Sequence, residues 1–401
     1  MIEKRPYILY NAIQHYEWGS MGEDAFIPKL LDFPAKDIPY AELWIGAHPK
    51  LSSKLEIENE LVELIKVISD HPVDILGRRV SEKFNNQLPF LLKVLSARKA
   101  LSIQTHPNRE QAKKLYDSDP INYPDDNHKP EIAIVLTSLD ALVGFRSYSE
   151  IMHSLGLYPS LKEYLGDYTE LLLEDSNEHG KLIEKIFTDL MLRSSDEESL
   201  KKCIDSISES ITQNHIKSKD AQLFNQLRSE YGYDIGLLTI FFLNNLQLNK
   251  GDAIFTSAGN PHAYLKGDIV ECMANSDNVV RAGLTPKHKD IETLLNVLNF
   301  DETDSIINGS KINEHIIKYS PPIEEFQIEE IRFDNSGIEL VTKNQVEILL
   351  VTDGNANIYV SDGIDEILTF EKGEVALMPA VIDKYRIYSE NDSQVFRVTI
   401  P

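Results

Sequence analysis

Cysteine is scarce in this sequence of 401 residues, which contains only Cys203 and Cys272. Two cysteines so far apart do not form a disulfide framework, so buried apolar cores must stabilise the fold. Long apolar runs are also missing, and the longest one, residues 235–243, is too short to span a bilayer. The opening residues contain no apolar stretch typical of a signal peptide. We therefore expect a soluble cytoplasmic protein that does not bind membranes.

Positive charge is in short supply as well. The chain has 40 Lys and Arg against 64 Asp and Glu, which gives a formal net charge of -24. Nucleic acids and anionic membranes require a basic surface, so this balance excludes general binding to either. The net negative charge is still compatible with a small anionic substrate, provided that a few Lys or Arg side chains form a local positive site.

Three regions with different patterns follow one another, and the length is typical of two or three domains. Residues 1–150 contain short strand-like runs such as "EIAIVLTS", broken by turn residues. Residues 151–248 are helical in pattern, with apolar pairs at three-to-four spacing in "KLIEKIFTDLMLR". From residue 249 short alternating strands return, as in "SQVFRVTI". We predict a mainly β protein with a helical insertion, an α+β chain, whose regular short strands favour jelly rolls or sandwiches.

A short internal repeat occurs within the third region. "KGDAIFTSAGNPHAYL" begins at Lys250, and "KGEVALMPAVIDKYRI" begins at Lys372. Both predict a turn, a strand, a tight bend and a second strand. His262 in the first copy aligns with Lys384 in the second, so a potential metal ligand is present in only one copy.

Polar side chains alternate along the strand-like stretch "LSIQTHPN". Ser102, Gln104 and His106 should share one face, because alternate residues of a strand point the same way. Two further polar residues, Glu131 and His262, begin strand-like runs elsewhere. Gln104, His106, Glu131 and His262 together offer two imidazoles, a carboxylate and an amide oxygen. This donor set suits a divalent transition metal, and it does not decide between zinc and non-haem iron.

Long motifs carry a family resemblance. "YEWGS", "ELWIGAHP", "PFLLKVLSARKALSIQTHPN", "HKPE", "SAGNPHAY" and "NSDNVVRAGLTPKHKD" occur in this order, and the sequence resembles the type I mannose-6-phosphate isomerases. The resemblance implies two cupin jelly-roll barrels plus an α-helical domain. The catalytic cupin would comprise residues 1–150 and 249–315, the helical insertion residues 151–248, and a degenerate second cupin residues 316–401.

The resemblance also implies one Zn²⁺ per chain, held at the positions of Gln104, His106, Glu131 and His262. Three other histidines, His48, His128 and His288, are rivals as ligands. The family pattern does not use their counterparts, so we leave them out of the metal set.

The implied reaction interconverts mannose 6-phosphate and fructose 6-phosphate through an enediol, by proton transfer between C1 and C2. It requires a Lewis acid for the developing oxyanion and a base for the proton. The matching motifs point to Lys129 and Glu271 as candidate bases, with His128 as a ring-opening or shuttle residue and Asp277 as a further proton-transfer or orienting group. No single base follows from the sequence.

The substrate phosphate requires cations, and Arg281 and Lys287 form the local pair that the acidic chain must supply. Arg281 is also a candidate for stabilising the enediol. In this family Ser102 would donate a hydrogen bond to a phosphate oxygen. Trp18 and Tyr264 are expected to line the pocket, and Lys93 is a lysine within an apolar strand, "FLLKVL", which favours a buried functional role.

Two alternatives remain open at this point. The same donors could hold iron in a cupin dioxygenase, and the chain could be a non-catalytic protein that binds sugar phosphates. The Arg281 and Lys287 pair and the fourth donor Gln104 favour the isomerase, because they anticipate an anionic substrate and a filled coordination shell. We expect a monomer.

Overall fold

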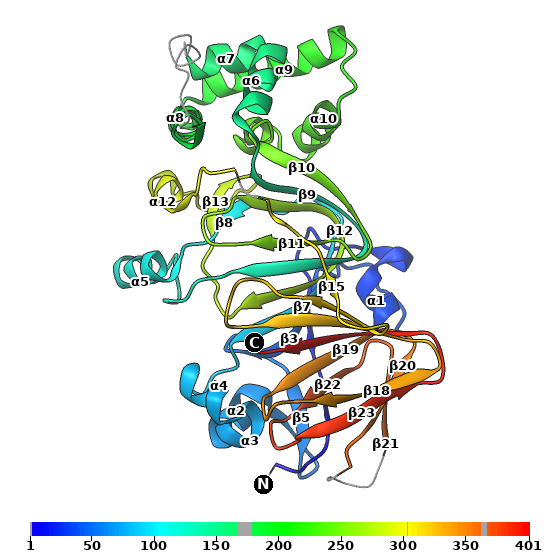
Figure 1. Cartoon of the computed structure of the whole chain (residues 1–401). Coiled ribbons are helices and arrows are strands. Elements are labelled where there is room, and N and C mark those ends of the chain that lie inside the picture. Colours follow the sequence, from blue (N-terminus) through cyan, green and yellow to red (C-terminus); the bar gives the residue numbers. More distant parts are fainter. Residues whose placement is uncertain (1, 167–178, 303, 362–366) are drawn as a thin grey trace.

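Two β-sheet regions lie one above the other, and a group of helices covers one end of the molecule (Figure 1). The computed structural model describes residues 2–166, 179–302, 304–361 and 367–401. This part of the chain is mostly β-sheet with helices, which confirms the α+β composition expected from the sequence. No helix within the described ranges is both long and apolar enough to cross a membrane.

The larger sheet has eleven strands, and its main path runs β14-β11-β9-β12-β7-β3-β2. All of its pairings are antiparallel, and β9 and β12 are much longer than the others. Most of their residues are buried, because other elements cover both faces. The strands are β2 (Ala12–Gln14), β3 (Glu42–His48), β4 (Leu51–Ser52), β7 (Phe90–Ala97), β8 (Ile103–Thr105), β9 (Glu131–Phe145), β10 (Leu243–Asn249), β11 (Ala253–Thr256), β12 (His262–Ala274), β13 (Val280–Gly283) and β14 (Ile306–Ile307).

The C-terminal region contains a seven-stranded and a four-stranded sheet with a shared apolar core. The seven-stranded sheet contains β1 (Tyr7–Ile8), β15 (Ser310–Lys311), β16 (Ile316–Tyr319), β17 (Gln327–Phe333), β19 (Glu347–Asp353), β22 (Val375–Met378) and β24 (Ser393–Thr399). The four-stranded sheet contains β18 (Ser336–Val341), β20 (Asn355–Tyr359), β21 (Ile367–Glu371) and β23 (Lys384–Ser389). A separate hairpin is formed by β5 (Lys54–Ile57) and β6 (Glu60–Glu63).

The two β regions are joined by one continuous core. Phe90 and Val270 of the larger sheet belong to the same buried apolar cluster as Ile348 and Phe396 of the seven-stranded sheet. The N-terminal strand β1 also pairs with β22, far along the chain. The domain boundaries given above stay a prediction.

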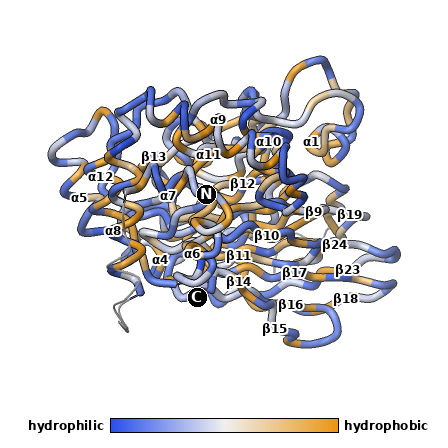
Figure 2. Tube along the Cα trace, turned by 90° about the horizontal axis from the view of Figure 1, so that it is seen from above, coloured by the Kyte–Doolittle hydropathy of each residue, from blue (hydrophilic) through white to orange (hydrophobic). Residues whose placement is uncertain are grey.

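The described part of the insertion is largely helical, as its apolar spacing predicts, and residues 167–178 of the predicted insertion lie outside the described residues. Its helices are α6 (Tyr148–Leu157), α7 (Pro159–Leu165), α8 (His179–Leu192), α9 (Glu197–Gln213), α10 (Lys219–Tyr231) and α11 (Gly236–Thr239), after which β10 returns to the sheet. The apolar pairs of α8 are all buried. Figure 2 shows hydrophobic residues interspersed with hydrophilic ones along the tube. Short helices outside the insertion were not predicted: α1 (Phe26–Leu30), α2 (Leu64–Asp70), α3 (Pro72–Leu76), α4 (Arg78–Lys83), α5 (Arg109–Ser118) and α12 (Ile291–Val297).

The internal repeat is confirmed by its backbone. Gly251 and Gly373 both have positive φ, +91° and +86°. The Gly251 N–H donates to the Val135 carbonyl at 2.9 Å, and the Gly373 N–H donates to the Val351 carbonyl at 2.8 Å. The two copies therefore form the same turn against corresponding strands, β9 and β19.

The strands that follow these turns also correspond. β11 and β22 come first, and β12 and β23 then begin at His262 and Lys384, the two residues that align in the repeat. The two β regions thus contain the same local hairpin with different chemistry at one equivalent position.

Asp234, just before α11, anchors the end of β13 to the helical insertion. One carboxylate oxygen accepts hydrogen bonds from the N–H groups of Gly236 at 2.7 Å and Leu284 at 2.6 Å, and the other pairs with Lys289 at 3.0 Å. Leu284 has a φ of +55°, which is strained for a side chain of this kind. A Cβ on Gly283 would lie 2.6 Å from the Gly236 backbone, so the two segments require glycine where they meet.

We predict that Asp234→Ala lowers the free energy of unfolding by about 2 kcal/mol, because two backbone N–H groups lose their acceptor in a largely buried place. Chemical denaturation followed by circular dichroism measures the change. The matched control is Asp205→Ala, which removes a more exposed partner of Arg228 in the same insertion and should cost under about 1 kcal/mol. Equal losses in the two variants would contradict the anchoring role.

Candidate metal centre and active site

Three buried side chains meet at the ends of separate strands. His106 follows β8, Glu131 opens β9 and His262 opens β12. The Nε2 atoms of His106 and His262 lie 3.4 and 3.3 Å from the two carboxylate oxygens of Glu131. Among the described residues, both Nε2 atoms and one oxygen of Glu131 are buried without a hydrogen-bond partner. Unpaired buried donor atoms of this kind are costly unless a cation binds them.

The Nδ1 atom of each imidazole already forms a hydrogen bond to a backbone carbonyl. The Nδ1 of His106 lies 2.7 Å from the Asn278 carbonyl, and the Nδ1 of His262 lies 3.0 Å from the Asn260 carbonyl. A carbonyl only accepts, so each ring carries its proton on Nδ1 and offers the lone pair of Nε2. Burial lowers the pKa of His106 to about 4, which keeps this ring neutral and able to bind a metal.

A tight turn places His262. Gly259, with a φ of +78°, begins this turn, and its N–H donates to the His106 carbonyl at 2.9 Å. A Cβ on Gly259 would lie 2.8 Å from the Val297 carbonyl oxygen, so only glycine fits this approach. The turn therefore fixes two of the three metal-facing residues relative to each other.

Gln104 is the fourth predicted donor, on β8. It is paired in register with His262 on one side and with Arg281 of β13 on the other. Its backbone therefore lies between a metal-facing residue and the predicted substrate cation. Coordination by its amide oxygen stays a prediction.

The three rival histidines have other surroundings. The Nε2 of His48 lies 3.5 Å from Asp277, and the Nε2 of His128 lies 2.8 Å from Glu325. His288 is exposed. Across the described ranges, His106, Glu131 and His262 form the one cluster of at least three His, Cys, Asp or Glu residues able to hold a metal ion.

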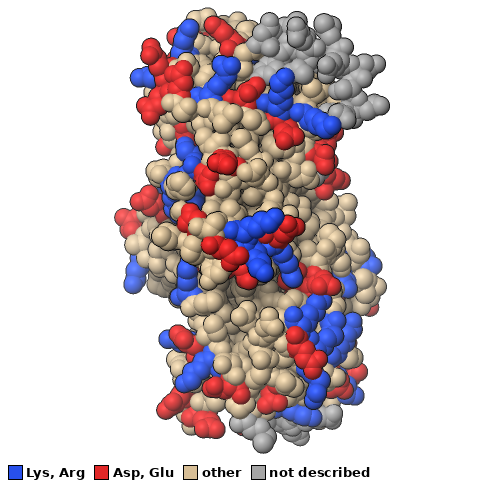
Figure 3. All heavy atoms as spheres, turned by 90° about the vertical axis from the view of Figure 1, so that its left-hand side faces the viewer, with Lys and Arg blue, Asp and Glu red and all other residues tan. Residues whose placement is uncertain are grey.

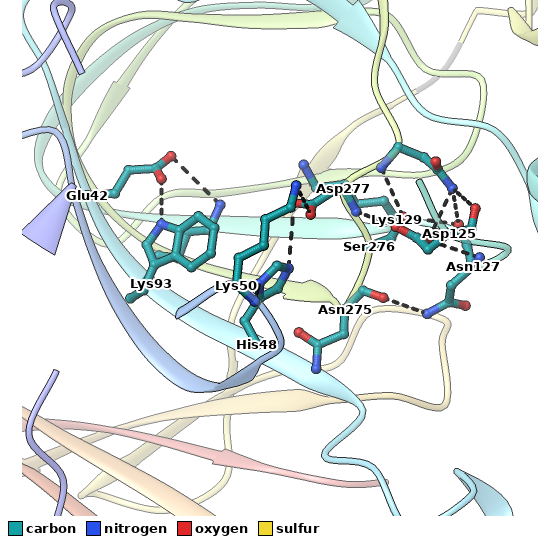
Figure 4. Close-up of polar contacts among 12 residues, drawn as sticks. Glu42, His48, Lys50, Lys93, Asp125, Asn127, Lys129, Asn275, Ser276 and Asp277 are labelled. Carbon is teal, nitrogen blue, oxygen red and sulfur yellow. Dashed lines mark hydrogen bonds and ion pairs between the residues drawn. The ribbon is translucent and has the colours of Figure 1, made fainter. Parts of the chain in front are cut away.

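A second buried cluster lies on β3, β7 and β12. The Nζ of Lys93 lies 3.2 Å from Glu271. It also lies 3.7 Å from Glu42, which accepts a 2.6 Å hydrogen bond from the indole of Trp44, and Figure 4 shows Lys93 beside Glu42. Burial alone would lower the pKa of Lys93, but the charges of Glu42 and Glu271 outweigh burial and raise it. Lys93 is therefore a permanent cation that suits binding or positioning better than accepting a proton.

The pKa of the buried Glu271 carboxyl is also raised, but here burial is the main cause. Burial raises its pKa even though Lys93 opposes the shift, and Glu131 and Glu42 add to it. A carboxyl group whose pKa is raised toward neutrality suits general acid–base chemistry. The nearby Tyr264 hydroxyl is buried, and burial raises its pKa, so it remains protonated.

Lys129 lies beside the metal-facing group. Its Nζ lies 3.1 Å from Glu131, and the residue is buried. A base at this position can reach a sugar whose oxygens bind near Glu131.

Asp277 lies in the loop between β12 and β13. Burial alone would raise its pKa, but His48 and Lys50 hold it well below its ordinary value, and Lys50 lies 2.7 Å away. The carboxylate is therefore ionised, which favours an orienting role over proton donation. Its backbone N–H donates to Asp125 at 2.7 Å, which ties this loop to the segment before His128 (Figure 4).

The predicted substrate cations have no acidic partner within the described residues. Arg281 is half-buried and Lys287 is exposed, and neither forms an ion pair there. Burial lowers the pKa of Arg281, but a guanidinium stays charged in proteins. Figure 3 shows the face that carries α5 and α12, where Lys and Arg atoms gather at mid-height. Ser102 and Trp18 are both half-buried, and Trp18 stacks on Tyr16 with ring centroids 5.7 Å apart.

Several polar residues of the site were missed from the sequence. Glu42 and Trp44 lie within the motif "ELWIGAHP", where an acid inside an apolar strand was the available signal. Asp125 and Glu325 gave no comparable signal, because each acts on a residue from another part of the chain.

Known proteins share this architecture. Residues 7–148 match the family described as phosphomannose isomerase type I, catalytic domain. Mannose-6-phosphate isomerase 2 of Arabidopsis thaliana is 34% identical over 409 residues, which cover 96% of this chain and 91% of that protein. A mutant of the phosphomannose isomerase from Salmonella typhimurium superposes with a TM-score of 0.88 at 29% identity, covering 98% of this chain and 99% of the other. A mannose 6-phosphate isomerase bound with zinc and yttrium gives a TM-score of 0.86 at 28% identity, with the same coverage.

We predict that His262→Ala abolishes stoichiometric binding of a divalent metal, because one of the converging Nε2 atoms is removed. Metal content of the purified protein, measured by atomic emission, tests this. The matched control is His48→Ala, which removes a buried histidine that pairs with Asp277 and should leave one metal per chain. Retention of a full equivalent of metal by His262→Ala would exclude this residue as a ligand.

Proposed function

Since the chain belongs to the type I phosphomannose isomerases, we propose that it interconverts mannose 6-phosphate and fructose 6-phosphate as a zinc-dependent aldose–ketose isomerase. The main support for this function is that His106, Glu131 and His262 lie together in the interior. Two imidazole nitrogens and one carboxylate oxygen of this group have no hydrogen-bond partner among the described residues. Two imidazoles and a carboxylate form a donor set that zinc favours.

The chemistry defines what the remaining residues must do. A hydrogen moves between C1 and C2 through an enediol, and a C–H bond next to a carbonyl is a weak acid. Zinc, held by His106, Glu131, His262 and the amide oxygen of Gln104, supplies a positive charge for the sugar oxygens when bound. Proton transfer itself must come from side chains of this chain.

Lys129 and Glu271 are the two residues proposed for proton transfer. Lys129 is supported by its 3.1 Å separation from Glu131, and Glu271 by the upward shift of its pKa. His128 is proposed to assist ring opening. Asp277, which is ionised beside Lys50 and His48, orients the loop that precedes Arg281.

Cations bind the anionic parts of the substrate. Arg281 and Lys287 have no acidic partner within the described part of the chain, so both are available for the phosphate or the enediol. Ser102 is proposed as a hydrogen-bond donor to the phosphate, and Lys93 as a buried cation beside the sugar. Trp18 and Tyr264 are proposed to line the pocket.

The two alternatives have no support of their own. Neither an iron dioxygenase nor a non-catalytic sugar-phosphate binder is indicated by the relatives, which carry the name of the isomerase. The two cupin jelly rolls, the monomeric state and the cytoplasmic location belong to this proposal. Two free buried cysteines support the last of these, because disulfides are rare in the cytoplasm.

We predict that the purified chain converts mannose 6-phosphate to fructose 6-phosphate in a coupled assay. Treatment with a chelator should reduce the rate to background, because the donor atoms then lose the cation, and added zinc should restore it. Absence of turnover by protein with a full equivalent of zinc would exclude the isomerase function.

We predict that Arg281→Ala keeps its zinc and lowers kcat/KM by about a hundredfold, since an unpaired half-buried guanidinium no longer faces the anionic substrate. Steady-state kinetics with parallel metal analysis measures this. Arg5→Ala serves as control, because Arg5 pairs with Glu3 away from the site and its loss should leave the rate unchanged. Equal kinetics for Arg281→Ala and the unmodified protein would remove Arg281 from the site.

A further inference from the structure

A buried carboxylate from the C-terminal β region reaches the predicted active site. Glu325 lies in the segment between β16 and β17, and only 2% of its surface is exposed. One of its oxygens accepts hydrogen bonds from the Arg109 guanidinium and from Nε2 of His128, the latter at 2.8 Å. The other oxygen accepts the backbone N–H of Glu324 at 3.1 Å. Glu325 thus connects three segments that are distant in the sequence.

The two partners of Glu325 come from segments that carry metal-facing residues. Arg109 lies three residues after His106, and His128 lies three residues before Glu131. Burial alone would raise the pKa of Glu325, but His128 and then Arg109 lower it to about 2, so the carboxylate is ionised under ordinary conditions. A negative charge therefore faces the imidazole of His128 permanently.

This contact determines which nitrogen of His128 is free. A carboxylate only accepts, so the proton of a neutral ring stays on Nε2, where it donates to Glu325. The remaining nitrogen, Nδ1, then carries the lone pair. Within the described residues Glu325 is the hydrogen-bond partner found for this side chain.

The backbone near His128 is held from the opposite side by the loop after β12. Asn278 donates from its side-chain amide to the carbonyls of Asp125 and Asn127 at 2.7 and 3.0 Å. The carbonyl of Asn278 in turn receives the Nδ1 proton of His106. The loop therefore fixes the chain leading to His128, and Glu325 fixes its ring.

We propose that Glu325 is a positioning residue of the isomerase reaction, which holds His128 as the Nε2–H tautomer so that any proton His128 exchanges passes through Nδ1. The proposal rests on the proposed function and extends it, because it makes the C-terminal β region a contributor to the reaction. The side-chain partners of Glu325 within the described residues are Arg109 and His128, and its effect is transmitted through His128.

Kinetics of a double-mutant cycle test this role. Glu325→Gln is nearly isosteric and should lower kcat about tenfold, with KM and zinc content within about twofold of the unmodified protein. In a His128→Asn background the same change should alter kcat by less than about twofold, because the residue through which Glu325 acts is gone. The proposal would be overturned if the two changes lowered kcat of the double variant by the product of their separate effects. It would also be overturned if Glu325→Gln left kcat unchanged.

The matched control is Glu324→Gln. It makes the same chemical change one residue earlier, where an exposed carboxylate pairs with Lys83 at 3.0 Å. Its kcat should stay within about twofold of the unmodified protein. A tenfold loss in this control would show that the segment as a whole, and not the contact with His128, determines the rate, and would also overturn the proposal.

A spectroscopic measurement reads the tautomer without substrate. In zinc-loaded protein with ¹⁵N-labelled histidine at pH 8.5, the His128 ring, assigned by its loss in His128→Asn, should show a proton on Nε2 and none on Nδ1. Glu325→Gln should shift both nitrogens toward tautomeric averaging. A proton on Nδ1 in the unmodified protein, or identical spectra in Glu325→Gln, would contradict the positioning role. This result does not depend on turnover, so failure of the isomerase function and failure of the Glu325 proposal are distinguishable.

Discussion

The electrostatic cost of burying His106, Glu131 and His262 together is the constraint on which the rest of the site depends. A buried carboxylate costs several kcal/mol unless a partner compensates it, and here two imidazole nitrogens and one carboxylate oxygen remain unpaired. A divalent cation satisfies all three at once. The backbone carbonyls of Asn260 and Asn278 accept the Nδ1 protons of His262 and His106, so both Nε2 lone pairs stay available at that point.

The same constraint explains why charged residues around the metal-facing group are arranged in pairs. Lys93 is balanced by Glu42 and Glu271, and Asp277 by Lys50 and His48. Arg281 and Lys287 form no such pair within the described ranges, and both are predicted to face an anionic substrate. In a chain with a net charge of -24, unpaired cations at this position are the local reversal of charge that a sugar phosphate needs.

The sequence predicted much of this arrangement, and the reasons are specific. Alternation in "LSIQTHPN" and the turn before His262 are local signals, so the donors His106 and His262 could be found from single segments. The backbone repeat at Gly251 and Gly373 was visible for the same reason. The pairs His128–Glu325 and Asp277–Asp125 join segments far apart in the chain, and no local pattern reports such contacts. The short helices α2, α3 and α4 were missed because each is too brief to show a helical period.

Zinc titration of the metal-free protein, with turnover of mannose 6-phosphate as the readout, tests the central claim most directly. If the isomerase works through one zinc ion bound by these donors, activity rises in proportion to added zinc and stops rising at one equivalent per chain. Full activity before any zinc is added, or a rise that continues well beyond one equivalent, would contradict the account.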